Sequence, residues 1–191
     1  MGDFSFYFKE GMYHITDLKG YDHILFVMAV CLPFLFQDWR KILILITAFT
    51  IGHSITLALR IFNAILIPSK WIEFLIPLTI FITAIGNLFA RKNQSYSKWT
   101  YGVVLLFGFI HGMGFSNYLK SMMSKSESII TQLLAFNIGL ELGQLIIVSF
   151  TLAVSYIFVH LLKIERREWA VFTSGGIVSL SLFMAVERNP F

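Results

Sequence analysis

Long apolar runs separated by short polar turns cover most of the 191-residue chain. Runs of about 18 residues or more are long enough to cross a bilayer as helices. The pattern therefore predicts an all-α fold, a polytopic membrane helix bundle that forms one integral membrane domain over residues 1–191. Six spans are expected, at about residues 21–37, 42–62, 71–90, 99–118, 129–162 and 169–187.

The first 20 residues follow a different pattern. Aromatic side chains such as Phe4 and Tyr13 alternate there with charged side chains such as Lys9 and Glu10. This mixture is too polar to span a bilayer and is typical of a short helix that lies in the membrane interface.

Basic residues near the helix ends set the orientation of a membrane protein. Lys19 is the only basic residue close before the first predicted span, whereas Arg40 and Lys41 follow it. We therefore expect both termini on the outer side of the membrane. Polar loops are expected at residues 91–98 and 121–128.

The composition agrees with a bilayer setting, because 57% of the residues are hydrophobic and only 14% are charged. About a quarter of the residues of a soluble protein are charged. The net charge of +4 bears on orientation, and with no basic patch interleaved with aromatic residues it predicts no nucleic-acid partner. The single cysteine, Cys31, excludes an intrachain disulfide and a CxxC metal site.

One polar stripe lies inside the fifth predicted span. Asn137, Glu141 and Gln144 have the spacing i, i+4, i+7, which places them on one face of a helix. A carboxylate within a bilayer costs at least a few kcal/mol unless it is paired or faces water. Glu141 is therefore a candidate functional residue that requires a partner.

Histidines also fall within apolar runs. His53 and His111 lie about eleven and twelve residues into two spans of the same direction, which predicts imidazoles at similar depth. Asp22 and His23 lie at the mouth of the first span, and His14 just precedes it. Imidazoles and carboxylates together at depth are typical of ligands for a divalent first-row metal.

Several of these residues also have a simpler interpretation. A single histidine in a membrane helix often forms a hydrogen bond between helices, and Asp22 has the position of a helix cap. Asn137, Gln144 and Ser54 could hold a metal ligand in place or form ordinary interhelical bonds. His160, without polar neighbours, is expected to be an interfacial residue.

A serine nucleophile is poorly supported, because neighbouring helix residues such as His53 and Ser54 point about 100° apart. A metal-activated water needs only histidine, an acid and an open coordination position. Metal-dependent hydrolysis therefore stays open, with the catalytic residues unknown apart from Glu141 as the candidate acid.

Four motifs in order along the chain carry a family resemblance. They are Gly-Tyr-Asp-His-Ile-Leu-Phe at 20–26, Phe-Thr-Ile-Gly-His-Ser-Ile-Thr at 49–56, His-Gly-Met-Gly-Phe at 111–115, and Phe-Asn-Ile-Gly-Leu-Glu-Leu-Gly-Gln at 136–144. With these motifs, the chain resembles the second branch of the HupE/UreJ family of bacterial integral membrane proteins.

The resemblance implies a nickel or cobalt permease in the bacterial inner (cytoplasmic) membrane, where the orientation above would make both termini periplasmic. By position it marks a metal-handling set, with zinc as a further candidate ion: His14, Asp22, His23, His53, His111 and Glu141. A looser resemblance to ceramidase-like membrane zinc hydrolases gives an alternative function. A third is a non-catalytic subunit of a membrane complex, and a homo-oligomer is also possible.

Overall fold

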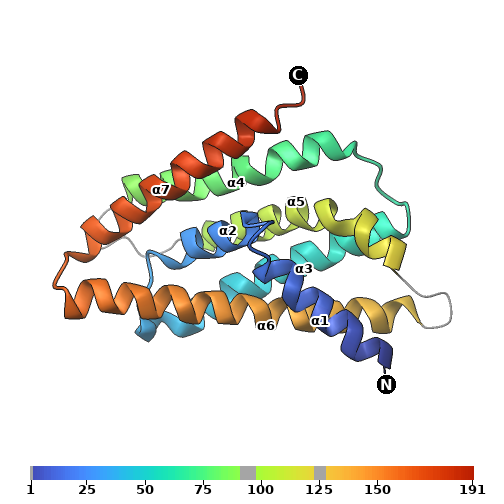
Figure 1. The fold of residues 1–191 in the computed structure, drawn as a ribbon, viewed down its shortest axis with the longest axis horizontal. Coiled ribbons are helices and arrows are strands. Elements are labelled where there is room, and N and C mark those ends of the chain that lie inside the picture. Colours follow the sequence, from blue (N-terminus) through green and yellow to red (C-terminus); the bar gives the residue numbers. More distant parts are fainter. Residues whose placement is uncertain (1, 91–97, 123–127) are drawn as a thin grey trace.

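The computed structural model, shown in Figure 1, describes residues 2–90, 98–122 and 128–191. Within these residues the helices are α1 (Gly2–Thr16), α2 (Asp22–Cys31), α3 (Trp39–Ile61), α4 (Ser69–Phe89), α5 (Lys98–Met122), α6 (Ile129–Tyr156) and α7 (Arg166–Glu187). A 3₁₀ turn, η1 (Phe36–Asp38), precedes α3, and a π-helical turn, η2 (Ile157–Leu161), extends α6. The predicted all-α polytopic bundle is confirmed. The two predicted polar loops fall almost entirely outside the described residues.

Five segments of the described chain are long and apolar enough to cross a bilayer: Phe36–Ile61, Ser69–Phe89, Thr100–Met122, Ile129–Leu161 and Arg166–Glu187. The sequence predicts a sixth span at 21–37, but the structure has the ten-residue helix α2 there. Ten helical residues rise about 15 Å, half of the hydrocarbon core. Pro33 follows two residues after Cys31 and has no backbone N–H group, so it cannot continue the helical hydrogen bonds.

Helix α1 crosses α6 obliquely (Figure 1) and packs directly against it. At the crossing, a Cβ atom on Gly11 of α1 would overlap the carbonyl oxygen of Phe136, and one on Gly139 of α6 would overlap that of Phe8. The two backbones therefore touch without intervening side chains, as small residues allow in membranes. The aromatic and polar segment predicted at the interface is thus fixed to a spanning helix, with Ile15 fully buried.

Helices α3 and α5 form the second close pair. A Cβ atom on Gly52 of α3 would overlap the carbonyl oxygen of Leu105, and one on Gly108 of α5 would overlap that of Phe49. Gly112, one turn further along α5, faces the carbonyl oxygen of His53 in the same way. This glycine contact fixes the axial register of the two helices, and with it the relative depth of the side chains beside the glycines.

Helices α4 and α7 make the third pair, and α2 lies inside the bundle among these pairs (Figure 1). The Asn87 amide of α4 donates to the carbonyl oxygen of Ala29 in α2 at 2.8 Å. The Arg167 guanidinium of α7 donates to the carbonyl oxygen of Asn87 at 2.9 Å, which satisfies an acceptor at the end of α4. Short α2 is thus surrounded by longer helices, and most of its residues are buried.

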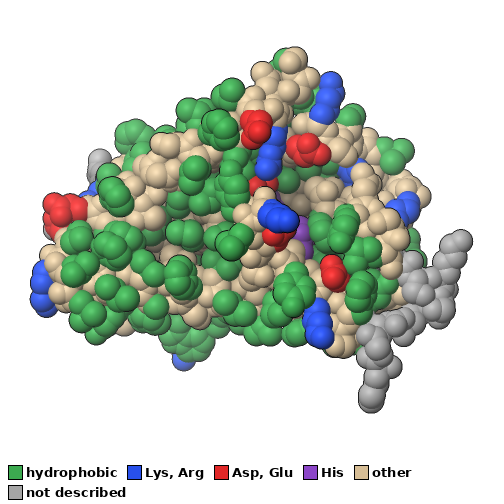
Figure 2. Space-filling view, in the orientation of Figure 1, with side chains coloured by type: hydrophobic (Ala, Val, Ile, Leu, Met, Phe, Trp, Pro, Cys, Tyr) green, Lys and Arg blue, Asp and Glu red, His purple; other side chains and the backbone are tan. Residues whose placement is uncertain are grey.

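Many of the charged side chains on the face seen in Figure 2 lie close together, and others lie at its left-hand end. The former lie in a band that crosses this face over the end of α1 and the end of α7, with a hydrophobic surface beside the band. A hydrophobic surface bounded by charges is the pattern that a bilayer requires, because the charged groups stay near water. The molecule is a multi-pass membrane protein.

We expect Gly108→Ala to lower the free energy of unfolding by about 1–3 kcal/mol, because the added methyl group forces α3 and α5 apart. Gly86→Ala is the matched control, since no atom lies within 4 Å of its Cβ position. It should leave stability unchanged or raise it by up to about 1 kcal/mol. The buried thiol of Cys31 can report unfolding through its reaction with a thiol-specific fluorophore. Equal stability of the two variants would contradict the glycine contact.

Candidate functional site

Three histidines from three helices meet inside the bundle. His14 comes from the last turn of α1, His23 from the first turn of α2 and His53 from the middle of α3. One ring nitrogen from each lies within 4.8 Å of the other two. Nitrogens bound to one ion at about 2.0–2.1 Å can be at most about 4.2 Å apart. Small side-chain rotations would therefore let all three bind the same ion.

The ring nitrogens of this cluster are short of hydrogen-bond partners. Within the described residues, Nε2 of His14, Nε2 of His23 and both nitrogens of His53 are buried without one. A buried polar atom without a partner costs about 1–3 kcal/mol. Several such atoms directed at one point fit a cation-binding site better than a packed core.

His111 of α5 stands next to the cluster, with its ring centroid 5.0 Å from that of His23. Its Nε2 lies 2.9 Å from the Thr79 hydroxyl of α4, and that hydroxyl donates to the carbonyl oxygen of Ile76 at 2.7 Å. Because the hydroxyl has one proton, the shared hydrogen must come from Nε2 of His111. Nδ1 then keeps its lone pair, and it is buried without a partner in the described chain.

Four phenylalanines surround the imidazoles: Phe26, Phe49, Phe115 and Phe136. Phe115 stacks closest, with its ring centroid 3.8 Å from that of His14. Phe49 and Phe136 flank His53 at 6.1 and 6.4 Å. These apolar rings lower the local dielectric constant and so strengthen electrostatic interactions beside them.

An open cavity of about 810 Å³ leads from the surface to His14. Its other lining residues are a mixture of charged, polar and aromatic side chains from α1, the turn after it and α5: Glu10, Tyr13, Thr16, Asp17, Leu18, Lys19, Phe115 and Tyr118. Figure 2 shows a histidine at the bottom of a hollow within the charged band. The cluster is therefore accessible from the side where the charges gather.

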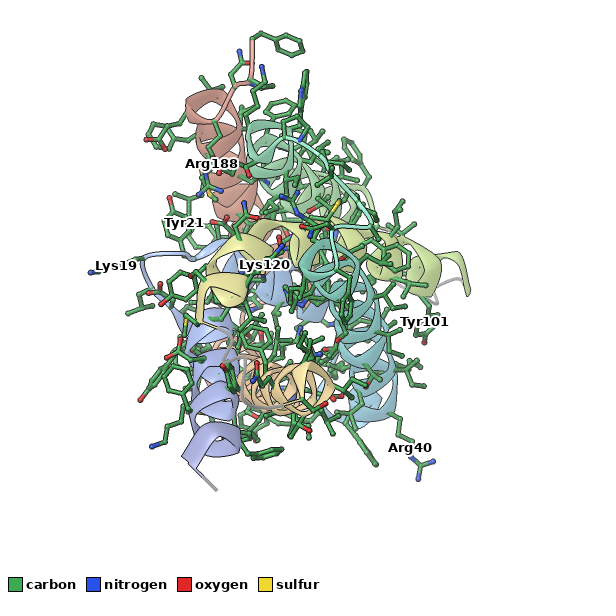
Figure 3. The ribbon with its side chains drawn as sticks, turned by 90° about the vertical axis from the view of Figure 1, so that its right-hand side faces the viewer. Lys19, Tyr21, Arg40, Tyr101, Lys120 and Arg188 are labelled. Carbon is green, nitrogen blue, oxygen red and sulfur yellow. The ribbon has the colours of Figure 1, made fainter. Side chains whose placement is uncertain are left out.

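Asp22, predicted as a metal ligand, is held by an arginine from the far end of the chain. Nη1 of Arg188 donates to Oδ2 of Asp22 at 2.6 Å, and Nη2 donates to Oδ1 at 3.3 Å. Figure 3 places Arg188 on the same side of the bundle as Tyr21, the residue before Asp22. The carboxylate oxygens of Asp22 are not part of the group of convergent ligand atoms, which comes from His14, His23 and His53.

The predicted polar stripe of α6 faces α3. The Thr47 hydroxyl donates to Oε1 of Glu141, and the Thr50 hydroxyl donates to Oε1 of Gln144, each at 2.8 Å. Glu141 is half-buried and Gln144 is buried. The structure thus supplies Glu141 with a hydroxyl partner and does not bring it into the histidine cluster.

Ser54 and Asn137, the other two residues predicted to support a metal ligand, form no hydrogen bond with the histidines in the described part of the chain. The Ser54 hydroxyl donates to the carbonyl oxygen of Thr50 within its own helix. Oδ1 of Asn137 is buried without a partner among the described residues.

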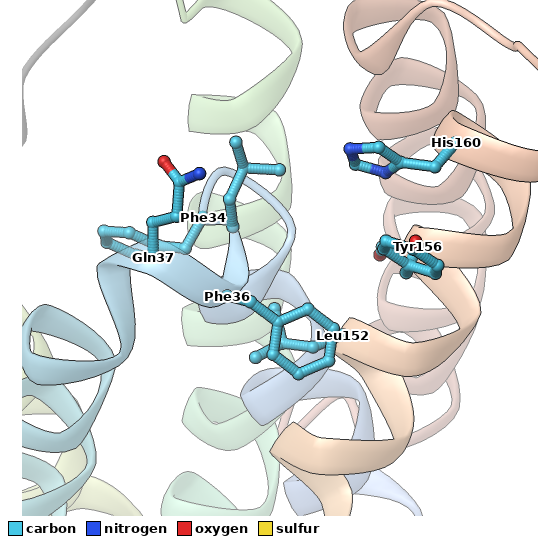
Figure 4. A pocket seen from close by; sticks show the side chains of 8 residues that line it. Phe34, Phe36, Gln37, Leu152, Tyr156 and His160 are labelled. Atoms are coloured by element: carbon cyan, nitrogen blue, oxygen red, sulfur yellow. The ribbon is translucent and has the colours of Figure 1, made fainter.

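His160 belongs to a separate pocket of about 140 Å³ between the end of α6 and the turn after α2. Figure 4 shows its ring beside that of Tyr156, with which it stacks at 4.6 Å, across from Phe34 and Phe36. It contributes nothing to the cluster of four histidines.

Two contributors to the site were missed by the sequence analysis, Arg188 and Thr79. Thr79 is hydrogen-bonded to His111 and Arg188 to Asp22, and in each pair the two residues are more than 30 positions apart in the sequence. The only sequence signal for Arg188 is that it is a basic residue just past the end of the last span.

Comparison with known families gives one match. A model described as "HupE / UreJ protein" matches residues 1–188, almost the whole chain. No curated protein and no solved structure matches.

Burial lowers the pKa of His14 well below 6.5, and the nearby His23, His53 and His111 lower it further. An unfolded chain binds a proton at this residue near pH 6.5, whereas the folded chain does so only at lower pH. We therefore expect the metal-free protein to lose stability as the pH falls below 6.5, in part through protonation of His14 in the unfolded chain.

Thermal unfolding followed by tryptophan fluorescence at pH 7 and pH 5, in the presence of a chelator, measures this loss. His14→Gln should reduce the difference between the two pH values. An equal difference in wild type and variant would mean that His14 is protonated in the folded protein.

Proposed function

This chain belongs to the HupE/UreJ family, and on that premise we propose that it is a permease for a divalent transition-metal cation. The proposed cargo is nickel or cobalt, which the family implies. The proposed place is a bacterial inner membrane, with both termini periplasmic.

The observation that carries this proposal is the convergence of the nitrogens of His14, His23 and His53 inside a membrane bundle. Imidazole nitrogen suits nickel, cobalt, zinc and copper, whereas magnesium and calcium prefer oxygen. A borderline cation is thus the best chemical fit to these donors.

The positions of the histidines suggest an order of contact. His14 lines the open cavity, whereas His23 is almost fully buried and His53 completely so. A cation entering from the charged side would meet His14 first and then share His23 and His53. His111 would complete the set from α5, with its Nδ1 available.

Of the two predicted acidic ligands, Glu141 keeps a proposed role at a later stage of transport. Asp22 adjoins His23 in sequence, and Glu141 is the one acid well inside a predicted span. Permeation requires that each site release the ion as well as bind it. The Glu141 carboxylate would take part once its bond with Thr47 is exchanged, whereas Asp22 stays bound to Arg188.

A metal-dependent hydrolase is the second candidate, favoured by one observation. Three histidines at the end of a cavity open to one side also suit a catalytic zinc ion, which keeps one position for water. No carboxylate of the described chain converges with the three imidazoles. A hydrolase at this site would therefore have no acidic side chain beside the ion to act as general base.

We expect detergent-purified protein to bind one Ni²⁺ or Co²⁺ ion per chain, measured by mass spectrometry after removal of free ions. His53→Ala and His23→Ala should each reduce the affinity at least tenfold, because each removes one of few ligands. His160→Ala is the matched control, since this histidine lies in the separate pocket. Equal metal content in all four proteins would remove the site.

Uptake into proteoliposomes separates transport from hydrolysis. Vesicles with wild-type protein should accumulate radioactive nickel faster than vesicles with His53→Ala, because the cluster lies on the proposed path. Stoichiometric binding without uptake would exclude the permease and leave the hydrolase or a structural metal.

A further inference from the structure

We propose that Arg188 determines which cations the site accepts, by keeping the Asp22 carboxylate out of the ligand set. This inference rests on the proposed function and adds the residue that sets specificity. Among the described residues, the donors that converge at the site are all imidazoles, although the carboxylate of Asp22 stands next to His23 in the sequence.

The first step is the geometry of the ion pair. The two guanidinium nitrogens of Arg188 bind the two oxygens of Asp22 side on, at 2.6 and 3.3 Å. A planar guanidinium matches a carboxylate in this bidentate form, and the pairing restrains both groups. Both oxygens of Asp22 are thus occupied by the same partner.

The second step is burial. The Asp22 side chain is 12% exposed and that of Arg188 is 29% exposed. A carboxylate so removed from water requires a positive partner, and Arg188 supplies one permanently. Without Arg188, the buried Asp22 carboxylate would lose the partner that binds both of its oxygens.

The third step is donor chemistry. Carboxylate oxygen suits hard cations such as Mn²⁺ and Mg²⁺, whereas imidazole favours Ni²⁺, Co²⁺ and Zn²⁺. An all-imidazole site therefore binds Mn²⁺ weakly, and a site that gains the Asp22 oxygen would bind it better. By holding Asp22, Arg188 keeps the preference for nitrogen-seeking metals.

Position along the chain supports a dedicated role. Arg188 follows the last residue of α7, while Asp22 begins α2, so the pair joins the end of the chain to the helix that carries His23. Lys70 provides a comparison at the same end of the molecule. Its ammonium group lies 3.3 Å from the carbonyl oxygen of Pro190, and among the described contacts it does not bind Asp22.

The test compares Mn²⁺ and Ni²⁺ affinities of the full-length protein by titration calorimetry in detergent. The variants are Arg188→Gln, Asp22→Asn, the double variant and the control Lys70→Gln. Arg188→Gln should raise the ratio of Mn²⁺ to Ni²⁺ affinity about tenfold, because it frees an oxygen ligand. The double variant should restore the wild-type ratio, and Lys70→Gln should leave it unchanged.

An unchanged ratio in Arg188→Gln, with Ni²⁺ still bound, would overturn the role of Arg188 alone. The same rise in Lys70→Gln would also overturn it, because general surface charge would then be the cause. If wild type binds no Ni²⁺, the proposed function itself fails. Should Arg188→Gln not fold, Arg188→Lys serves instead, since one ammonium group cannot hold both oxygens and should produce a smaller rise.

Discussion

Direct contact between helix backbones at glycine determines the rest of this structure. Gly52 and Gly108 bring α3 against α5, and Gly11 and Gly139 bring α1 against α6. In a bilayer the lipid chains are as apolar as leucine, so close packing has to replace the hydrophobic effect between helices. Each glycine contact places a histidine a few residues away at a fixed depth, and the site follows from the packing.

The site combines a polar interior with an apolar wall. Neutral imidazoles can remain inside the bundle at modest cost, whereas a protonated imidazole or a free carboxylate would be expensive. The two acids expected to bind metal are accordingly occupied, Asp22 by Arg188 and Glu141 by Thr47. The bundle therefore presents neutral donors with lone pairs, which a cation can use without first displacing a proton.

Much of this could be predicted from the sequence, because apolar runs and helical spacing are local signals. The runs predicted the spanning helices, and the positions of His53 and His111 within two runs of the same direction predicted that they lie at similar depth. The sequence could not show that α2 is short inside the bundle, or that Asp22 meets a residue 166 positions away. The sequence also could not show which neighbouring helix a polar face contacts. Helical spacing placed Asn137, Glu141 and Gln144 on one face, and the structure shows that this face meets α3.

The division of the bundle into glycine-locked pairs has a consequence for the number of ligands. His14 belongs to the α1–α6 pair, His53 and His111 belong to the α3–α5 pair, and His23 stands on the short helix between them. A slide of one pair along the other would withdraw nitrogens from a shared ion while every close backbone contact stayed intact. For the proposed cation, the coordination number would thus change in whole steps as the pairs slide, at the cost of the hydrogen bonds that join α3 to α6.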